Sequence, residues 1–172
     1  MKVGILALQG SFSEHEVVLQ KLKQEFILVK TKQDLINLTH LIIPGGESTT
    51  IEKLLKKSGM WEELEKSIKG LKVFGTCAGS ILCAKLGMDI EVDRNGYGAQ
   101  KDSFEAELES EMFSELKGIF IRAPKFKVGK TGIVLASFND EPVLVEQDNF
   151  LVCSFHPELV GEIRIHEYFL EK

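Results

Sequence analysis

The sequence contains little cysteine and no long hydrophobic run. Its three cysteines, Cys77, Cys83 and Cys153, are odd in number and lack C-x-x-C spacing, so neither a disulfide framework nor a zinc site is indicated. No apolar stretch reaches the length of a membrane span, and residues 1–5 run directly into a strand-like pattern without a signal-peptide cleavage site. We therefore expect a cytoplasmic protein with no membrane partner.

The sequence also lacks an excess of positive charge. Its 21 lysines and arginines stand against 26 acidic residues, which gives a formal net charge of -5, and the cations are scattered along the chain. A nucleic-acid partner is therefore not expected. Of the 172 residues 44% are hydrophobic, which is enough for one sizeable core, and we expect a single domain over residues 1–172.

The apolar pattern changes character along the chain. Short apolar runs alternate with helical spacing in the first half, whereas short strands follow one another in the second. Strands are predicted at residues 2–8, 26–29, 40–43, 71–74, 90–93, 103–108, 118–121, 133–138, 142–145 and 150–155, with hairpin turns at 139–140 and 148–149. Helical segments are predicted after a capping box of Ser13 and Glu16, at 33–38, after Ser48 or Thr49, at 61–68, after Cys77 and at 162–170. This order predicts a three-layer α/β fold with a mixed, mostly parallel sheet and short antiparallel strands in the second half.

Residues 71–86 join a buried strand to a helix through Gly75-Thr76-Cys77-Ala78-Gly79. Glycine on both sides permits a tight turn that raises Cys77 above the edge of the sheet. Because a helix begins directly afterwards, its dipole and free N–H groups face the sulfur and favour the thiolate. Cys77 is thus a candidate nucleophile, although from this pentapeptide alone a small buried residue at a strand–helix junction is the better interpretation.

A second set of candidate residues, His156-Pro157-Glu158, follows the last predicted strand. In an extended chain, side chains two residues apart point the same way, so the Glu158 carboxylate can lie beside the His156 ring. A carboxylate on one ring nitrogen leaves the other free to act as a base toward a thiol. The tripeptide alone is more simply a lone histidine with an exposed glutamate. However, Cys77 and His156 both follow the carboxyl ends of strands, where open α/β sheets place their sites.

A third strand end carries Pro44-Gly45-Gly46-Glu47-Ser48. Successive glycines let backbone N–H groups point into a cavity, so Gly46 and Ala78 are candidates for an oxyanion hole. Glycine-rich turns of this kind also occur in α/β folds without any function. In combination, a nucleophile, a base with its acid, and oxyanion donors on three strand ends favour an acyl-transfer site.

These motifs resemble those of class I, triad-type glutamine amidotransferases, and more closely those of the glutaminase subunits (PdxT type) of pyridoxal 5'-phosphate synthase. The similarity spans nearly the whole chain and rests on LALQG (6–10), PGGESTT (44–50), FGTCAG (74–79), RNGYG (94–98), DSFEAEL (102–108), FIRAP (120–124) and CSFHPEL (153–159). GTCAG and HPE are shared among related amidotransferases, whereas PGGESTT, DSFEA and FIRAP narrow the resemblance to this family. It implies the flavodoxin-like, class I glutamine amidotransferase fold.

The resemblance also implies roles for the candidate residues. It makes Cys77 the nucleophile, His156 the general base and then acid, and Glu158 the carboxylate that orients His156. The glutamine pocket it implies is lined by Gly46, Glu47, Ser48, Arg94, Ile121 and Arg122. An arginine suits the α-carboxylate of the substrate as a charge-assisted donor. The resemblance implies no metal and no cofactor.

The reaction implied is hydrolysis of L-glutamine to L-glutamate and ammonia through a cysteine thioester. The ammonia is passed to a PdxS-type synthase subunit in a hetero-oligomer that makes pyridoxal 5'-phosphate (vitamin B6). Two alternatives are a glutaminase subunit of another amidotransferase, such as imidazole glycerol phosphate synthase, and a non-catalytic scaffold subunit. PGGESTT and DSFEA argue against the first, and the intact Cys77, His156 and Glu158 argue against the second.

Two further positions carry expectations. Ala99 stands where many members of the family have arginine, a departure that affects one polar or partner contact. His15 resembles a family position near the synthase interface, and its place close to the start of a helix predicts a surface residue.

Overall fold

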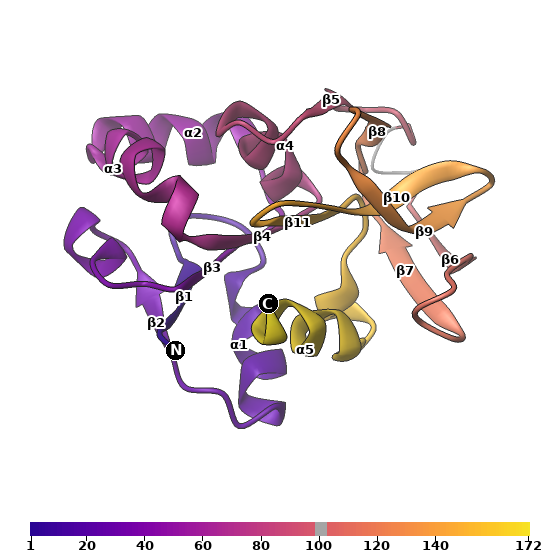
Figure 1. Ribbon diagram of the computed structural model, residues 1–172, viewed down its shortest axis with the longest axis horizontal. Coiled ribbons are helices and arrows are strands. Elements are labelled where there is room, and N and C mark those ends of the chain that lie inside the picture. Colours follow the sequence, from indigo (N-terminus) through magenta and orange to yellow (C-terminus); the bar gives the residue numbers. More distant parts are fainter. Residues whose placement is uncertain (99–102) are drawn as a thin grey trace.

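The computed structural model describes residues 1–98 and 103–172 as an α/β structure (Figure 1). Its longer elements are β1 (Val3–Leu6), α1 (Phe12–Lys21), β2 (Phe26–Val29), β3 (His40–Ile43), α2 (Ser48–Lys57), α3 (Met60–Ser67), β4 (Lys72–Thr76), α4 (Ala78–Lys85), β5 (Ile90–Asp93), β6 (Phe104–Leu108), β7 (Leu116–Phe120), β8 (Lys125–Val128), β9 (Ile133–Phe138), β10 (Glu141–Gln147), β11 (Phe150–Cys153) and α5 (Arg164–Glu171). Short 3-10 helices are η1 (Lys32–Leu35), η2 (Ile68–Gly70) and η4 (Pro157–Leu159). The expectation about Ala99 lies outside the described residues.

A seven-stranded sheet runs through the molecule in the order β2-β1-β3-β4-β11-β10-β9. The pairs from β2 to β11 are parallel, and their register sets His40 beside Val3 and Lys72, and Thr76 beside Cys153. Strands β10 and β9 are added antiparallel at one end. The predicted mixed, mostly parallel central sheet is confirmed.

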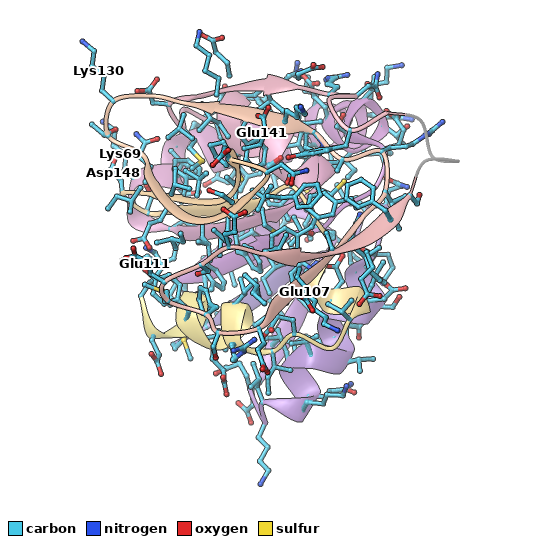
Figure 2. The ribbon with its side chains drawn as sticks, turned by 90° about the vertical axis from the view of Figure 1, so that its right-hand side faces the viewer. Lys69, Glu107, Glu111, Lys130, Glu141 and Asp148 are labelled. Atoms are coloured by element: carbon cyan, nitrogen blue, oxygen red, sulfur yellow. The ribbon has the colours of Figure 1, made fainter. Side chains whose placement is uncertain are left out.

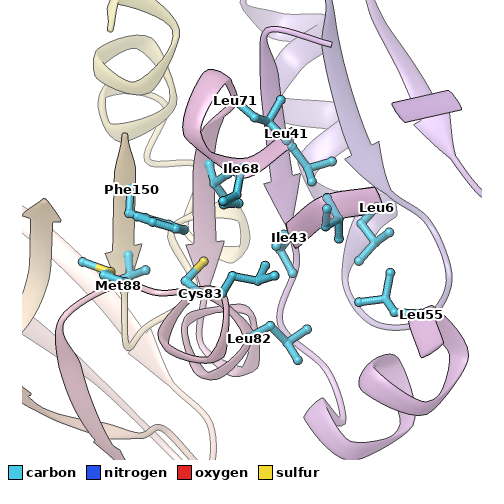
Figure 3. Packing of buried hydrophobic residues seen from close by; sticks show 14 of the residues in the cluster. Leu6, Leu41, Ile43, Leu55, Ile68, Leu71, Leu82, Cys83, Met88 and Phe150 are labelled. Carbon is cyan, nitrogen blue, oxygen red and sulfur yellow. The ribbon is translucent and has the colours of Figure 1, made fainter. Parts of the chain in front are cut away.

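Helices cover both faces of the sheet, with α2, α3 and α4 above it and α1 and α5 below it in Figure 1. Because side chains alternate along a strand, Leu41 and Ile43 of β3 face the first group of helices while Ile42 faces the second. Figure 3 shows the first layer, where Ile43 lies near Leu82 of α4. The second layer includes Ile5, Leu19, Phe74, Ile165 and Phe169. The continuous apolar strands of the sequence are therefore buried on two sides.

The start of α1 differs from the prediction. The helix begins at Phe12, directly after Ser11, whose N–H donates to the carbonyl of Gly45 at 2.9 Å. This bond fixes the chain before the helix, so Ser13 already lies inside the first turn and its hydroxyl bonds to Glu14. The predicted capping box of Ser13 and Glu16 was wrong.

The start of α2 also has a different cap. The Glu47 carboxylate accepts the N–H groups of Thr49 and Thr50 at 3.0 and 2.7 Å, so Glu47 is the N-cap rather than Ser48 or Thr49. A carboxylate accepts two amides at once and complements the positive end of the helix, which a hydroxyl does less well. Helix α2 ends at Lys57 with Ser58 as its C-cap, and Gly59 follows in the left-handed region with φ 69°, a position that favours glycine.

The second half of the chain adds two small antiparallel sheets, β5-β8 and β6-β7. Asn139 and Asp140 have φ of 51° and 62° in the turn between β9 and β10, and Asp148 has φ 51° in the next turn, as expected of hairpin positions. Strand β8 was not predicted, although the alternation of lysines with apolar residues in KFKV is typical of a half-buried strand; the run has only four residues, and only Phe126 is fully buried.

Figure 2 looks onto this strand-rich end of the molecule. It labels four acidic residues and two lysines: Glu107, Glu111, Glu141, Asp148, Lys69 and Lys130. All are exposed except the half-buried Glu141. Charges of both signs are interspersed there, which is typical of a solvated surface. Within the described ranges, none of the helices has the combination of length and apolar character that crossing a bilayer requires.

The parallel strands β1, β3, β4 and β11 end at the same edge of the sheet. The chain then continues into residues 7–11, 44–47, 77 and 154–158 respectively. Because β2 and β3 lie on opposite sides of β1, this edge is a point where the direction of the winding reverses. Ligands of open α/β sheets bind at such a point.

Candidate active site

A cavity of about 670 Å³ opens at this edge of the sheet. All but one of the predicted site residues line it: Gly46, Glu47, Ser48, Cys77, Ala78, Arg94, Ile121, Arg122 and His156. The exception, Glu158, lies behind His156, and its side chain is completely buried. The residues that the sequence singled out on separate strand ends therefore gather around one cavity.

Cys77 occupies the apex between β4 and α4, and its backbone carries the strain of the turn. Its φ of 47° and ψ of -109° are rare for a residue other than glycine. The neighbouring glycine serves close packing instead, because a Cβ on Gly79 would lie 2.0 Å from the carbonyl oxygen of Ile43. The N–H of Cys77 donates to Cys153 at 2.8 Å, and its sulfur lies 3.6 Å from the carbonyl oxygen of Ile121. These contacts fix a thiol at the wall of the cavity.

His156 Nδ1 lies 2.7 Å from Glu158 Oε1. The two residues meet by a different route from the one predicted, because β11 ends at Cys153 and Pro157 opens the 3-10 helix η4. The N–H of His156 donates to the carbonyl of Ile119 at 2.8 Å, which draws the chain out of the sheet at this point. A helical turn, and not an extended chain, brings the carboxylate to the ring.

The charges of this pair follow from their contacts. Burial acts to lower the pKa of His156, but hydrogen bonds with Cys77 and Glu158, and the Glu158 charge, outweigh it and raise that pKa to about 10. Burial acts to raise the pKa of Glu158, and the nearby rings of His15 and His156 outweigh it and lower that pKa to about 2. At neutral pH the pair is therefore an imidazolium and a carboxylate, with a proton on His156 available for transfer.

The glycine loop after β3 packs tightly against this pair. A Cβ added to Gly45 would lie 2.4 Å from His156 Cε1 and 3.2 Å from Cys77 Cβ. A Cβ on Gly46 would lie 2.5 Å from Gln9 Oε1, and the same oxygen accepts the N–H of Glu47 at 2.8 Å. The loop can approach the nucleophile and base only because it has no side chains at these positions.

Two arginines stand at the rim of the cavity. Arg94 and Arg122 are exposed, and Arg94 Nη1 donates to Thr49 Oγ1 at 3.2 Å. The Glu47 carboxylate at the same rim accepts hydrogen bonds from Thr50 and Thr49, which lower its pKa to about 2. Guanidinium groups beside an ionised carboxylate suit a ligand that carries both a carboxylate and an ammonium group. No group of three or more His, Cys, Asp or Glu within the described residues is arranged to hold a metal ion.

Three residues of the site were missed from the sequence. Ser11 Oγ donates to Glu158 Oε1 at 2.8 Å, and Thr76 Oγ1 accepts the N–H of Gly45 at 3.0 Å. His15, predicted to lie on the surface, is fully buried, with Nε2 3.7 Å from Glu158 Oε1. Ser11 could have been found from its position after β1, because the carboxyl end of β1 lies at the same edge of the sheet as the other site residues. The burial of His15 depends on α5 packing over α1, which no local pattern reveals.

The fold and the site together define a class of protein. Thiol-dependent acyl-transfer enzymes typically have a cysteine at a strand–helix elbow of an open α/β sheet, a histidine paired with a carboxylate, and a glycine loop beside them. Residues 5–172 match the SNO glutamine amidotransferase family. The chain belongs to this family of glutamine amidotransferases.

Curated relatives with the name pyridoxal 5'-phosphate synthase subunit PdxT are similar over nearly their full length. The protein from Pseudothermotoga lettingae is 51% identical, covering 99% of this chain and 95% of the relative. The protein from Thermosipho africanus is 48% identical, covering 99% of this chain and 97% of the relative. The protein from Francisella philomiragia is 48% identical, covering 99% of this chain and 98% of the relative.

Solved structures agree on the fold. A glutamine amidotransferase crystal structure that is 46% identical covers 98% of this chain and 97% of its own, with a TM-score of 0.93. PurLQS from Thermotoga maritima, only 14% identical, has a TM-score of 0.76 over 99% of this chain and 97% of its own, and shows the fold alone.

Proposed function

We propose that this chain is the glutaminase subunit of a pyridoxal 5'-phosphate synthase, which hydrolyses L-glutamine to L-glutamate and ammonia. The observation that carries the proposal is the buried 2.7 Å contact of His156 with Glu158 beside Cys77, in a family member whose full-length relatives carry that subunit's name. The whole chain, residues 1–172, serves as one glutamine amidotransferase domain in the cytoplasm.

The reaction begins with attack of the Cys77 thiolate on the side-chain carbonyl carbon of glutamine. The backbone N–H groups of Gly46 and Ala78 hold the oxyanion of the tetrahedral intermediate, each such donor being worth about 3 to 4 kcal/mol of the barrier. The C–N bond breaks as the His156 imidazolium gives its proton to the departing nitrogen, and ammonia leaves. Glu158 keeps the ring oriented and stabilises its charge.

The second half of the reaction returns the enzyme to its starting state. His156, now neutral, takes a proton from water while the hydroxide attacks the γ-glutamyl thioester carbon. The C–S bond breaks, which releases glutamate and restores the Cys77 thiolate with a protonated His156. Arg94 and Arg122 bind the α-carboxylate of the substrate, and Glu47, Ser48 and Ile121 form the rest of the pocket.

The ammonia is delivered to a PdxS-type synthase subunit bound to this chain in a hetero-oligomer. The relatives' name, a synthase subunit, supports such a partner. A glutaminase of this kind serves its purpose only when another active site consumes the ammonia before it reaches water.

The test is glutamate release from glutamine by the wild type and Cys77→Ala, each with and without the synthase subunit. We expect turnover by the wild type, faster with the synthase, and none by Cys77→Ala. A wild type that stays silent when the synthase subunit is present would contradict the proposed function.

A further inference from the structure

A second group of bonded side chains lies behind Glu158 and has no part in the reaction above. His15 of α1 and His166 of α5 are both 0% exposed. His15 Nδ1 lies 2.8 Å from His166 Nε2, while His15 Nε2 lies 3.2 Å from Thr76 Oγ1 and 3.7 Å from Glu158 Oε1. His166 therefore bonds to His15, and His15 lies beside the carboxylate of the site and bonds to the residue before the nucleophile.

The same group reaches the glycine loop. Thr76 Oγ1 accepts the N–H of Gly45 at 3.0 Å, and Gly45 packs against the ring of His156. His15 thus lies against two components of the site at once. Its Nε2 is 3.7 Å from Glu158 Oε1, close enough for an electrostatic interaction but not for a hydrogen bond, and it reaches the loop that carries Gly46 through the Thr76 hydroxyl. His166 holds the ring of His15 from the other side, and Phe74 packs edge-on against both rings.

Burial is the largest influence on both rings. It lowers the pKa of His15, against the charge of Glu158, and it lowers the pKa of His166 to about 3, so that His166 is neutral at pH 7. His15 Nδ1 and His166 Nε2 share one hydrogen, which either ring can donate. Thr76 Oγ1 likewise accepts from His15 Nε2–H or donates to the bare nitrogen. In either arrangement His15 is bonded through both ring nitrogens.

We propose that His15 and His166 are positioning residues of the glutaminase reaction: His166 orients His15, and His15 in turn fixes the Glu158 carboxylate and, through Thr76, the oxyanion loop. The inference rests on the proposed function. Glu158 depends on few donors, since Oε1 is bonded by His156 and Ser11 while Oε2 has no partner among the described residues. A carboxylate held so sparsely shifts when the His15 contact is lost, and His156 shifts with it.

The variants that test this are His166→Leu and His166→Gln, assayed for glutamate release with the synthase subunit present. His166→Leu removes the hydrogen-bond partner of His15 Nδ1. We expect kcat to fall about 10- to 100-fold with KM within about twofold of wild type, as for a reacting group displaced by a fraction of an ångström to 1 Å. The side-chain amide of His166→Gln can either donate to His15 Nδ1 or accept from it, so it should restore kcat to within a few-fold of wild type.

His40 supplies the matched control. It is also a nearly buried histidine and packs 5.2 Å from Phe169 of the same helix α5, but its ring bonds to Thr39 at the opposite end of the sheet. His40→Leu should lower the melting temperature and leave kcat unchanged. Wild-type kcat in His166→Leu, or an equal fall of kcat in His40→Leu, would overturn the positioning role.

A measurement on the wild type covers the case in which His166→Leu does not fold. The 15N chemical shifts of the histidine side chains should show His15 held as one tautomer by its two hydrogen-bond partners, and exchange between the two tautomers would overturn the inference. The two proposals also fail separately. A silent wild type refutes the glutaminase function, whereas an active wild type with a fully active His166→Leu refutes only the positioning role.

Discussion

Gly45→Ala is the substitution whose effect the structure predicts most directly. The added Cβ would lie 2.4 Å from His156 Cε1, about 1 Å short of the 3.4 Å at which ordinary van der Waals contact begins. Gly45 does not have a positive φ, so alanine fits its backbone and the overlap with the ring is the main perturbation. The ring has to yield by about that distance, and His156 Nδ1 cannot follow without disturbing its 2.7 Å bond to Glu158.

A displacement of about 1 Å at a reacting group costs on the order of 100-fold in rate. We therefore expect Gly45→Ala to lower kcat for glutamate release about 100-fold in the presence of the synthase subunit. Overpacking of this kind costs about 1 to 3 kcal/mol of stability. For a chain of this size that corresponds to a fall of about 2 to 12 °C in Tm, so assays at about 25 °C report on a folded protein.

Gly70→Ala is the control for this experiment. Gly70 lies in η2, and a Cβ there would meet nothing within 4 Å. Its kcat and Tm should match the wild type within error. Wild-type kcat in a folded Gly45→Ala would refute the view that the glycine loop holds the His156 ring in place.

Two further outcomes follow from the charges of the site. Glu158→Gln should lower kcat about 1,000- to 10,000-fold with little change in KM, because an amide cannot stabilise the imidazolium; a loss below about tenfold in steady-state kinetics would contradict this role of Glu158. The lowered pKa of Glu158, about 2 in place of 4.5, makes its contribution to the free energy of unfolding complete above pH 4.5 and lost as the pH falls toward 2. The raised pKa of His156, about 10 in place of 6.5, makes its contribution complete below pH 6.5 and lost as the pH rises through 10. Over the acidic range, the urea unfolding midpoint should therefore fall more steeply in the wild type than in Glu158→Gln. Over the basic range, it should fall more steeply in the wild type than in His156→Gln. Parallel declines of wild type and variant would contradict these charge states.

The sequence predicted the parts of the fold that depend on local pattern. The apolar runs before Gln9, Pro44 and Cys77 are buried strands, and the elbow lies between β4 and α4. Strand β8 was missed although its apolar positions alternate with lysines, as in a half-buried strand, because the run has only four residues. Helix caps were also misjudged: Glu47 outcompetes the hydroxyl residues that follow it, and a bond to the distant Gly45 sets the start of α1.

The candidate site could be assembled from the sequence because each component follows a strand end. What could not be predicted are the contacts made by residues far apart in the chain. Glu158 is bonded by Ser11 and approached by His15, both about 150 positions away. Likewise, the left-handed backbone of Cys77 shows that the strain of the elbow lies on the cysteine, whereas the motif suggested that its glycines would carry it.

The central claim is that Cys77 attacks the side-chain carbonyl of glutamine. The most direct measurement is peptide mass spectrometry after treatment with a glutamine analogue that carries a diazoketone in place of the side-chain amide. We expect one covalent adduct on Cys77, which lines the cavity, prevented by excess glutamine and absent from Cys77→Ala, while the fully buried Cys83 and Cys153 stay unlabelled. Labelling of Cys83 or Cys153 in preference to Cys77, or no adduct when the synthase subunit is bound, would contradict it.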